Sequence, residues 1–210
     1  GIPLTVPVID AAVKKGVPVS SELDIFYQYN TLPVIAITGT NGKTTTTTLM
    51  GDMLQAAGYK PFVCSNIGTP LIDLFLDDHF SDEKQEPGKK FDVVVAEISS
   101  FQMDISRQFR PDVGVLLNIS EDHLDRYDSF SAYADAKWRL FEYQTESDAA
   151  VINRTINGFT ARSAQLKSKI SPFAPSFDPS LKGHGWECQA AVRSGAIDIT
   201  CGKHAHAVQT

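Results

Sequence analysis

One stretch decides the fold of this chain: Pro33-Val34-Ile35-Ala36-Ile37-Thr38-Gly39-Thr40-Asn41-Gly42-Lys43-Thr44-Thr45. Residues 33–37 are apolar and rich in β-branched side chains, which predicts a strand buried on both faces. Residues 44–57 then indicate a helix that Gly58 would close. The glycines between the two allow a tight turn and expose backbone N–H groups at the N-terminus of the helix. The stretch therefore predicts a strand, a phosphate-binding loop and a helix, in that order.

The loop supplies the groups that the phosphates of a nucleotide need. Lys43 would place its charge on the β and γ phosphates, and Thr44 would offer its hydroxyl to Mg²⁺. The spacing is two residues shorter than the usual G-x-x-x-x-G-K-[ST], and an ordinary glycine turn that caps a helix is the alternative. The predicted nucleotide-binding residues are Gly39, Thr40, Asn41, Gly42, Lys43, Thr44 and Thr45.

Three further apolar runs, at 93–96, 113–117 and 149–152, are similar to the first strand. They are short, they do not alternate with polar residues, and helix-like stretches separate them, among them a helix at 130–143. This pattern predicts an α/β fold with a mostly parallel sheet flanked by helices and with ligands at the carboxyl ends of its strands. In the C-terminal part of the chain the pattern fades, and only 197–200 indicate a strand, at a sheet edge. Residues 82–90 predict a charged surface loop.

The beginning of the chain is typical of the end of a preceding domain. Apolar residues at helical spacing predict a helix at 7–15, a short strand at 17–19 and a second helix at 22–29. Because the chain starts at Gly1 rather than at a methionine, we expect it to be a piece of a longer protein.

Composition limits the classes of function. The 210 residues are 42% hydrophobic and carry a net charge of −6, which excludes the basic field of a nucleic-acid binder or an anionic-membrane binder. No apolar run approaches the roughly 20 residues that span a bilayer. The three cysteines are odd in number, widely spaced and without a C-x-x-C pair, which favours a reducing compartment. We expect a soluble, cytoplasmic protein.

Two polar residues follow predicted strands directly. Glu97 comes after the run at 93–96 and would emerge beside the loop, where with Thr44 it could bind Mg²⁺. The alternative is a surface glutamate at the end of a strand. His123 lies in a polar turn just past the run at 113–117. At this position a structural role for the histidine is as plausible as a role as a metal ligand.

Lys137 interrupts the apolar stripe of the helix predicted at 130–143. A lysine in such a position either extends its ammonium to water or lies in a site where its chemistry changes. Periodicity alone favours the first interpretation. The stripe consists of Phe130, Tyr133, Ala134, Lys137, Leu140 and Phe141.

Taken together, four features resemble the Mur ligase family in order and spacing. They are the loop at 39–45, the tract Glu97-Ile98-Ser99-Ser100-Phe101-Gln102, the tract Leu117-Asn118-Ile119-Ser120-Glu121-Asp122-His123-Leu124-Asp125-Arg126, and Lys137. The Ser-Ser-Phe-Gln tract, Asn66-Ile67-Gly68 and the opening of the chain are most similar to the family members that add D-glutamate to UDP-N-acetylmuramoyl-L-alanine. The resemblance is close from residue 1 to about 153.

The resemblance implies a role for each candidate residue. Lys43 would contact the phosphates of ATP, Thr44 and Glu97 would hold one magnesium ion, and His123 would contribute to a second. Lys137 matches the lysine that is carbamylated in the family, a change that turns a cation into an oxygen ligand. The implied sets are catalytic Lys43, His123 and Lys137, metal-binding Thr44, Glu97, His123 and Lys137, and substrate-binding Asn66, Ser99, Gln102 and Asp122.

The resemblance also implies a domain organisation. Residues 1–31 would be the end of a UDP-binding N-terminal domain with its linker, and 32–210 an ATP-binding central domain that is incomplete at its C-terminal end. A C-terminal Rossmann-like domain would be absent from these 210 residues, so we expect them to be nearly inactive alone. The implied reaction forms an amide bond in a peptidoglycan precursor through an acyl phosphate and releases ADP and phosphate. Its partners would be small molecules, acted on by a monomer.

Two alternatives stay open. The first is another Mur-type or folylpolyglutamate-type ligase, against which the tract at 99–102 argues. The second is a nucleotide-binding P-loop module without ligase activity. Such a module would need Lys43 and Thr44 but would make no use of Glu97, His123 or Lys137.

Overall fold

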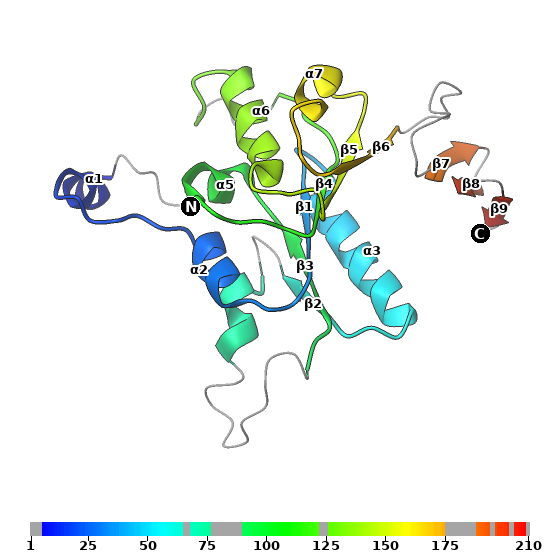
Figure 1. The fold of residues 1–210 in the computed structure, drawn as a ribbon, viewed down its shortest axis with the longest axis horizontal. Helices are drawn as coiled ribbons and strands as arrows, with labels where there is room; N and C mark the ends of the chain where they lie inside the picture. The colour runs from blue at the N-terminus through cyan, green and yellow to red at the C-terminus, as the bar shows by residue number, and fades with distance from the viewer. Residues whose placement is uncertain are drawn as a thin grey trace.

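The computed structural model describes residues 6–64, 68–76, 90–121 and 126–174, and beyond these the backbone of three short strands. A six-stranded sheet forms its centre, in the order β2-β3-β1-β4-β5-β6 (Figure 1). Every neighbouring pair of strands in this sheet is parallel. The strands are β1 (Val34–Thr38), β2 (Pro61–Cys64), β3 (Val93–Glu97), β4 (Val113–Leu116), β5 (Ala149–Asn153) and β6 (Lys169–Phe173). The predicted α/β fold with a mostly parallel sheet is confirmed.

Helices cover both faces of the sheet (Figure 1). On one face, α3 (Lys43–Ala56) packs against β1, β2 and β3. The other face carries α2 (Glu22–Tyr29), α5 (Ser100–Ile105) and α6 (Phe130–Trp138). Successive side chains of β1 serve the two faces in turn, since Ala36 joins the larger hydrophobic cluster and Ile37 the smaller one. The other helical segments among the described residues are α1 (Pro7–Lys14), η1 (Leu71–Phe75), η3 (Arg139–Phe141) and α7 (Phe159–Ser163).

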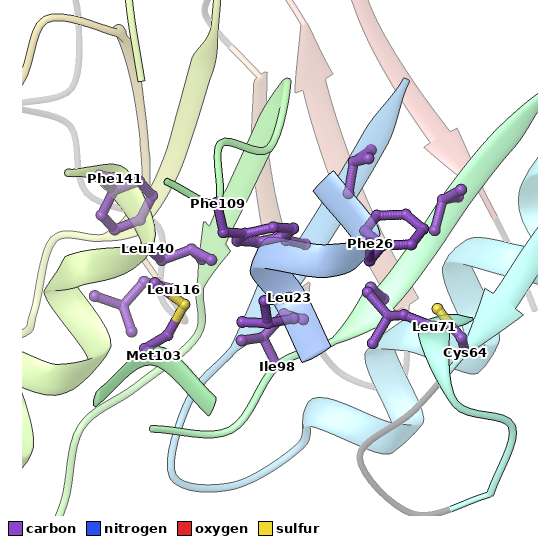
Figure 2. Packing of buried hydrophobic residues seen from close by; sticks show 14 of the residues in the cluster. Leu23, Phe26, Cys64, Leu71, Ile98, Met103, Phe109, Leu116, Leu140 and Phe141 are labelled. Carbon is purple, nitrogen blue, oxygen red and sulfur yellow. The ribbon is translucent and has the colours of Figure 1, made fainter. Parts of the chain in front are cut away.

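The larger hydrophobic cluster joins α2 to the sheet (Figure 2). Leu23 and Phe26 of α2 are fully buried in this cluster. Asp24, which is also buried, accepts a hydrogen bond from Ser106 Oγ at 2.7 Å. By contrast, α1 contributes no buried residue. The described structure therefore places α2 in the hydrophobic core of the sheet and leaves α1 outside it.

Two predictions about single elements near the ends of the chain are wrong. No strand forms at 17–19, where Pro18 has no N–H to donate to a neighbouring strand. The strand predicted at 197–200 exists but is not at an edge. It is β8 (Ala196–Cys201), the middle strand of a second, antiparallel sheet between β7 (Cys188–Arg193) and β9 (His204–Val208).

The helix predicted over 130–143 is shorter than expected. The α-helical part ends at Trp138, and η3 continues it with the tighter winding that is common at helix ends. Neither β2 nor β6 was expected. The charged loop predicted at 82–90 lies almost wholly outside the described residues.

The order of the strands determines where a ligand can bind. From β1 the chain moves to one side of the sheet to build β2 and β3, and then to the other side to build β4, β5 and β6. Ligands of such sheets bind outside the carboxyl ends of the strands at the point where the direction reverses. Here this point is the carboxyl end of β1, where the predicted phosphate loop begins.

Candidate functional site

The loop between β1 and α3 depends on two glycines. Gly42 has a φ of 80°, a left-handed conformation that favours glycine, and directly precedes α3. A Cβ atom on Gly39 would lie 3.0 Å from Cβ of Leu117, closer than side chains normally pack. Glycine at 39 thus lets the loop pass close to the end of β4. The strand, the tight turn and the helix follow one another as predicted.

The N-terminus of α3 gathers positive charge at this loop. The first N–H groups of a helix have no partner within the helix, and the helix dipole adds a partial positive charge there. Lys43, the first residue of α3, contributes a full charge, and its Nζ donates to the carbonyl oxygen of Thr40 at 3.0 Å. Lys43 is thus folded over the loop. This arrangement suits an anion such as a phosphate.

Thr44 and Glu97 are in direct contact. Thr44 Oγ1 donates to Glu97 Oε2 at 2.8 Å, although 53 positions separate the two residues. The contact arises because Glu97 is the last residue of β3, which pairs with β1 so that Ile37 and Glu97 lie in register. Glu97 is 5% exposed, so its carboxylate is fixed beside the loop and not at the open surface. A hydroxyl and a carboxylate this close are a donor set that suits Mg²⁺.

Lys137 reaches the loop from the opposite face of the sheet. Its Nζ donates to the carbonyl oxygen of Gly39 at 2.8 Å and lies 4.5 Å from the ring centroid of Tyr133. Lys137 is only 2% exposed. The interpretation that its ammonium extends to water is therefore wrong, because α6 carries the side chain inward to the loop. Lys43, Thr44, Glu97 and Lys137 all meet at 39–44.

Two residues that the sequence did not single out hold the loop in place. Asn118, two positions past the end of β4, binds both backbone groups of Asn41. Tyr133 Oη is 3.1 Å from Oγ1 of Thr40, within hydrogen-bonding distance. The available signals were weak: Asn118 follows a predicted strand, and Tyr133 precedes Lys137 by one helical turn.

Ser99 and Gln102 form the N-terminal cap of α5. Gln102 N donates to Ser99 Oγ at 3.3 Å, and Ser99 N donates to Gln102 Oε1 at 2.9 Å, a reciprocal capping box. Next to this cap, Phe101 stacks on Tyr127 with ring centroids 5.8 Å apart. Burial raises the pKa of Tyr127 above its usual range, and its hydroxyl donates to Asp104. The cap gives Ser99 and Gln102 a structural role beside their expected role in substrate binding.

Three of the expected site residues, Asn66, Asp122 and His123, lie outside the described residues. Within the described ranges, no group of three or more acidic, histidine or cysteine side chains could hold a metal ion. In that same part of the chain, every helix is too short or too polar to cross a membrane. A pocket of about 130 Å³ opens beside Asn118; it is lined by Asn118, Ile119, Phe130, Ala134, Asn153, Thr155, Ile156 and Asn157.

Comparison with known proteins gives consistent matches. Residues 37–176 match the family model of the Mur ligase middle domain. A UDP-N-acetylmuramoylalanine–D-glutamate ligase from Trichlorobacter lovleyi is 45% identical over 174 residues, which are 83% of this chain and 37% of that protein. An enzyme of the same name from Desulfosudis oleivorans is 51% identical over 153 residues, 73% of this chain and 31% of that protein. The chain thus spans only about a third of the length of these curated relatives.

A solved structure supports the fold. The UDP-N-acetylmuramate:L-alanyl-gamma-D-glutamyl-meso-diaminopimelate ligase from Neisseria meningitides superposes with a TM-score of 0.63 at 20% sequence identity. The match covers 97% of this chain and 63% of that one. At this identity the likeness concerns the fold alone.

Proposed function

The chain belongs to the Mur ligase family by its middle domain, and we propose that the complete protein is an ATP-dependent ligase that joins D-glutamate to UDP-N-acetylmuramoyl-L-alanine. The names of the two curated relatives support this choice of substrates. The proposal includes small-molecule substrates only, a monomeric state and a cytoplasmic location. It also includes the division of the chain into the end of an N-terminal domain with its linker, at 1–31, and an ATP-binding central domain, at 32–210.

The contact between Thr44 and Glu97 is the observation that carries the proposal. The phosphate loop alone would suit any nucleotide-binding module, but a buried carboxylate 2.8 Å from the loop's threonine hydroxyl also suits the metal ion that accompanies ATP. Thr44 and Glu97 would hold one magnesium ion, and His123 would help to hold a second. Such ions neutralise the charge that develops on the transferred phosphate.

The loop and α3 would position the triphosphate. Backbone N–H groups at the start of α3 would bind phosphate oxygens, and Lys43 would exchange its contact with the Thr40 carbonyl for the β and γ phosphates. The carboxylate of the muramoyl substrate would then attack the γ phosphate, and ADP would leave. Catalysis of this step consists of alignment and charge stabilisation.

Lys137 would act as a carbamate. In that reaction the neutral amine attacks CO₂, a C–N bond forms, and one proton is released. The nitrogen would keep an N–H for the Gly39 carbonyl, which Lys137 already contacts at 2.8 Å. The new carboxylate would add an anionic oxygen ligand beside a loop that is otherwise rich in positive charge. Carbamylation thus supplies a reason for a lysine that is 2% exposed.

The remaining residues would serve the second half of the reaction. The amine of D-glutamate attacks the acyl phosphate, a tetrahedral intermediate forms, and phosphate leaves as the amide bond is completed. Asn66, Ser99, Gln102 and Asp122 would line the path of the muramoyl substrate. Positive groups near the loop would stabilise the negative charge of the intermediate.

The test is a phosphate-release assay on the complete protein with ATP, Mg²⁺, UDP-N-acetylmuramoyl-L-alanine and D-glutamate. We expect phosphate release to require both UDP-N-acetylmuramoyl-L-alanine and D-glutamate. Neither L-glutamate nor meso-diaminopimelate should replace D-glutamate, and a folate should not replace UDP-N-acetylmuramoyl-L-alanine. Release with a folate acceptor, or none with D-glutamate, would contradict the proposed substrates. The 210-residue chain alone should show almost no turnover.

Two variants separate a ligase from a nucleotide-binding module. Lys137→Ala should retain ATP binding and lose the ligase turnover that the wild type shows. A module that only senses nucleotide would show no ligase turnover even as the wild type, and its ATP binding would be unaffected by the substitution. Thr44→Val removes the hydroxyl and should weaken Mg²⁺-dependent ATP binding by about tenfold or more, whereas Thr44→Ser keeps the hydroxyl and should stay close to the wild type. Equal affinities for the two Thr44 variants would contradict the assigned metal contact.

A further inference from the structure

We propose that Asn118 is the positioning residue of the phosphate loop: its side-chain amide holds the backbone of Asn41 so that the N–H groups that follow face the phosphates. This inference rests on the proposed function. Asn118 lies two residues beyond the end of β4, and Asn41 lies in the middle of the loop. The two residues are 77 positions apart in sequence.

Three hydrogen bonds join Asn118 to the loop. The N–H of Asn41 donates to Oδ1 of Asn118 at 2.9 Å, and Nδ2 of Asn118 donates to the carbonyl oxygen of Asn41 at 3.0 Å. The backbone N–H of Thr40 donates to the carbonyl oxygen of Asn118 at 3.0 Å. The side-chain amide therefore pairs with Asn41 as a neighbouring strand would, one donor to one acceptor on each side. An aspartate lacks the donor, and a leucine of similar size lacks both groups.

These bonds decide which N–H groups remain for a ligand. Those of Thr40 and Asn41 are already used by Asn118. In a trans peptide the C=O and the N–H point in opposite directions. Because Asn118 holds the carbonyl of Asn41, the N–H of Gly42 in the same peptide points away from Asn118. The cradle for phosphate oxygens therefore begins at Gly42 and continues into the first turn of α3.

The conformation of Gly42 agrees with this assignment. Its φ of 80° and ψ of 3° are left-handed, and the next residue is the first of a right-handed helix. Left-handed and right-handed residues in succession turn their N–H groups towards one concave side, where an anion binds. Holding the Asn41 peptide in place fixes the start of this turn.

Asn118 also joins the loop to the segment that follows β4. In addition to the Asn118 contacts, the N–H of Ser120 donates to Oγ1 of Thr40 at 3.0 Å. The loop is thus bound at two points to the start of the segment that continues to Asp122 and His123. The same contacts thus hold the phosphate loop and residues 118–120 together.

The site suits a test by substitution. Asn118 is half-buried and Asn41 is exposed, so water can replace the lost hydrogen bonds and the fold should survive. In the complete protein, Asn118→Leu should raise the KM for ATP by about tenfold, the loss expected when hydrogen bonds worth about 1–2 kcal/mol no longer fix the loop. Its KM for D-glutamate should not change. Asn118→Asp, which keeps the acceptor for the Asn41 N–H, should lie between Asn118→Leu and the wild type.

Asn157→Leu is the matched control. It makes the same substitution in the same pocket, but Asn157 is exposed and no contact with the loop is found for it among the described residues. We expect wild-type KM values for it and a melting temperature close to those of the wild type and Asn118→Leu. An unchanged KM for ATP in Asn118→Leu, or equal effects of Asn118→Leu and Asn157→Leu, would overturn the inference.

Direct titration with ATP and with AMP separates this inference from the proposed function. Asn118→Leu should lose affinity for ATP and much less for AMP, because the loop acts on the outer phosphates. If the wild type binds ATP but does not ligate D-glutamate, the proposed reaction fails and the Asn118 comparison can still be read from ATP affinity. If the wild type ligates and Asn118→Leu matches it in both assays, the inference alone fails.

Discussion

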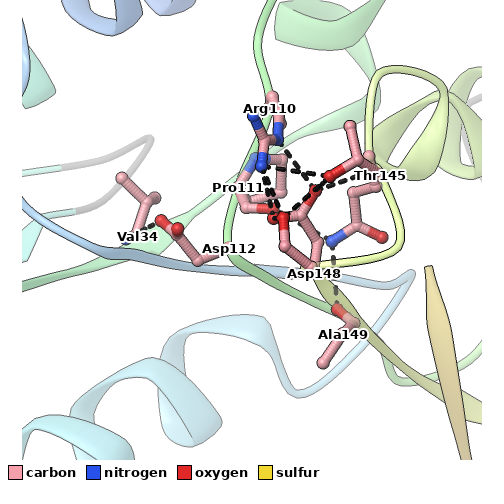
Figure 3. A network of polar contacts seen from close by, with 9 residues as sticks. Val34, Arg110, Pro111, Asp112, Thr145, Asp148 and Ala149 are labelled. Atoms are coloured by element: carbon pink, nitrogen blue, oxygen red, sulfur yellow. Dashed lines mark hydrogen bonds and ion pairs between the residues drawn. The ribbon is translucent and has the colours of Figure 1, made fainter.

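At the scale of single residues, the two ends of the strands carry different groups. The phosphate loop and Glu97 lie at the carboxyl ends, where Lys137 also reaches the loop. A structural polar network lies at the amino ends (Figure 3). There, Arg110 donates to both carboxylate oxygens of Asp148, from Nε at 2.8 Å and from Nη2 at 2.9 Å. Asp148 immediately precedes β5, and Asp112, which immediately precedes β4, accepts the N–H of Val34 at 2.8 Å. These carboxylates fix where the strands begin.

The Asp148 carboxylate should make stability depend on pH. Burial by itself would raise the pKa of Asp148, but the hydrogen bonds from Arg110 and Thr145 outweigh it and hold that pKa below its usual range. A depressed pKa in the folded state stabilises the fold above the unfolded-state pKa of about 3.9. This contribution is lost as the pH falls through the lower, folded-state pKa.

We therefore expect Asp148→Asn to lower the free energy of unfolding at neutral pH by about 1–3 kcal/mol. The difference from the wild type should narrow below about pH 4, as the wild-type carboxylate becomes protonated. Urea denaturation between pH 7 and pH 3 measures both quantities. Asp135→Asn is the control, because Asp135 pairs with Arg162 at the surface and should contribute about 0–1 kcal/mol. A constant difference between wild type and Asp148→Asn across this range would contradict the assignment.

The same scale shows which site residues a sequence can identify. Glu97 could be placed beside the loop because parallel strands bring their carboxyl ends to one edge, and that rule needs no side-chain detail. The side-chain direction of Lys137 could not be predicted. The spacing of apolar residues does not show that the carbonyl oxygen of Gly39 lies within the protein where it can accept a hydrogen bond from the Lys137 ammonium. Asn118 was missed for a similar reason. Its role follows from a contact between two loops that are far apart in sequence.

At the scale of elements, local patterns were sufficient where an element is buried on both sides. The runs that became β1, β3, β4 and β5 are continuous and apolar. By contrast, β2 has only four residues, and β6 contains Pro172, which is tolerated because β6 ends the sheet. The position of β8 inside its small sheet depends on β7 and β9, which carry no strong pattern of their own. The sequence alone therefore does not predict the strands that lack a continuous apolar run of their own and form only where a neighbouring strand pairs with them.

The contact between β4 and η3 gives a prediction at this scale. A Cβ atom on Gly114 would lie 2.8 Å from Cε1 of Phe141, a residue that is itself 1% exposed. We expect Gly114→Ala to destabilise the fold by about 1–3 kcal/mol, which is the cost of overpacking a dense core. This loss is expected although alanine normally stabilises a strand more than glycine does. Denaturation in urea measures the loss.

A second substitution tests the cause of that loss. Leucine at position 141 is smaller than the phenylalanine ring and leaves space for the new methyl group. Gly114→Ala combined with Phe141→Leu should therefore cost less than the sum of the two single changes. Strict additivity would mean that the ring is not what the methyl group meets.

At the scale of the whole molecule, α2 packs into the same hydrophobic core as the central sheet. Its side chains Leu23 and Phe26 lie in the same cluster as Leu116 of β4 and Ile152 of β5, which are spread across the sheet. The cluster also includes Phe141 of η3 (Figure 2). The α2 helix thus shares one hydrophobic core with these three elements, β4, β5 and η3. We therefore expect α2 to fold and unfold together with the nucleotide site.

Phe26→Ala tests this expectation against an adjacent control. Phe26 is 0% exposed, and its removal should lower the free energy of unfolding of the whole central unit by about 3–5 kcal/mol. Ile25, the preceding residue on α2, is 41% exposed, so Ile25→Ala should cost less than about 1 kcal/mol. The measurement is urea denaturation followed both by circular dichroism and by ATP binding. In Phe26→Ala, the urea midpoints from circular dichroism and from ATP binding should fall together. The reason is that the phosphate loop follows β1 directly, and β1 shares its hydrophobic core with α2. Loss of helical signal at low urea with unchanged ATP binding would instead show that α2 belongs to a separate unit.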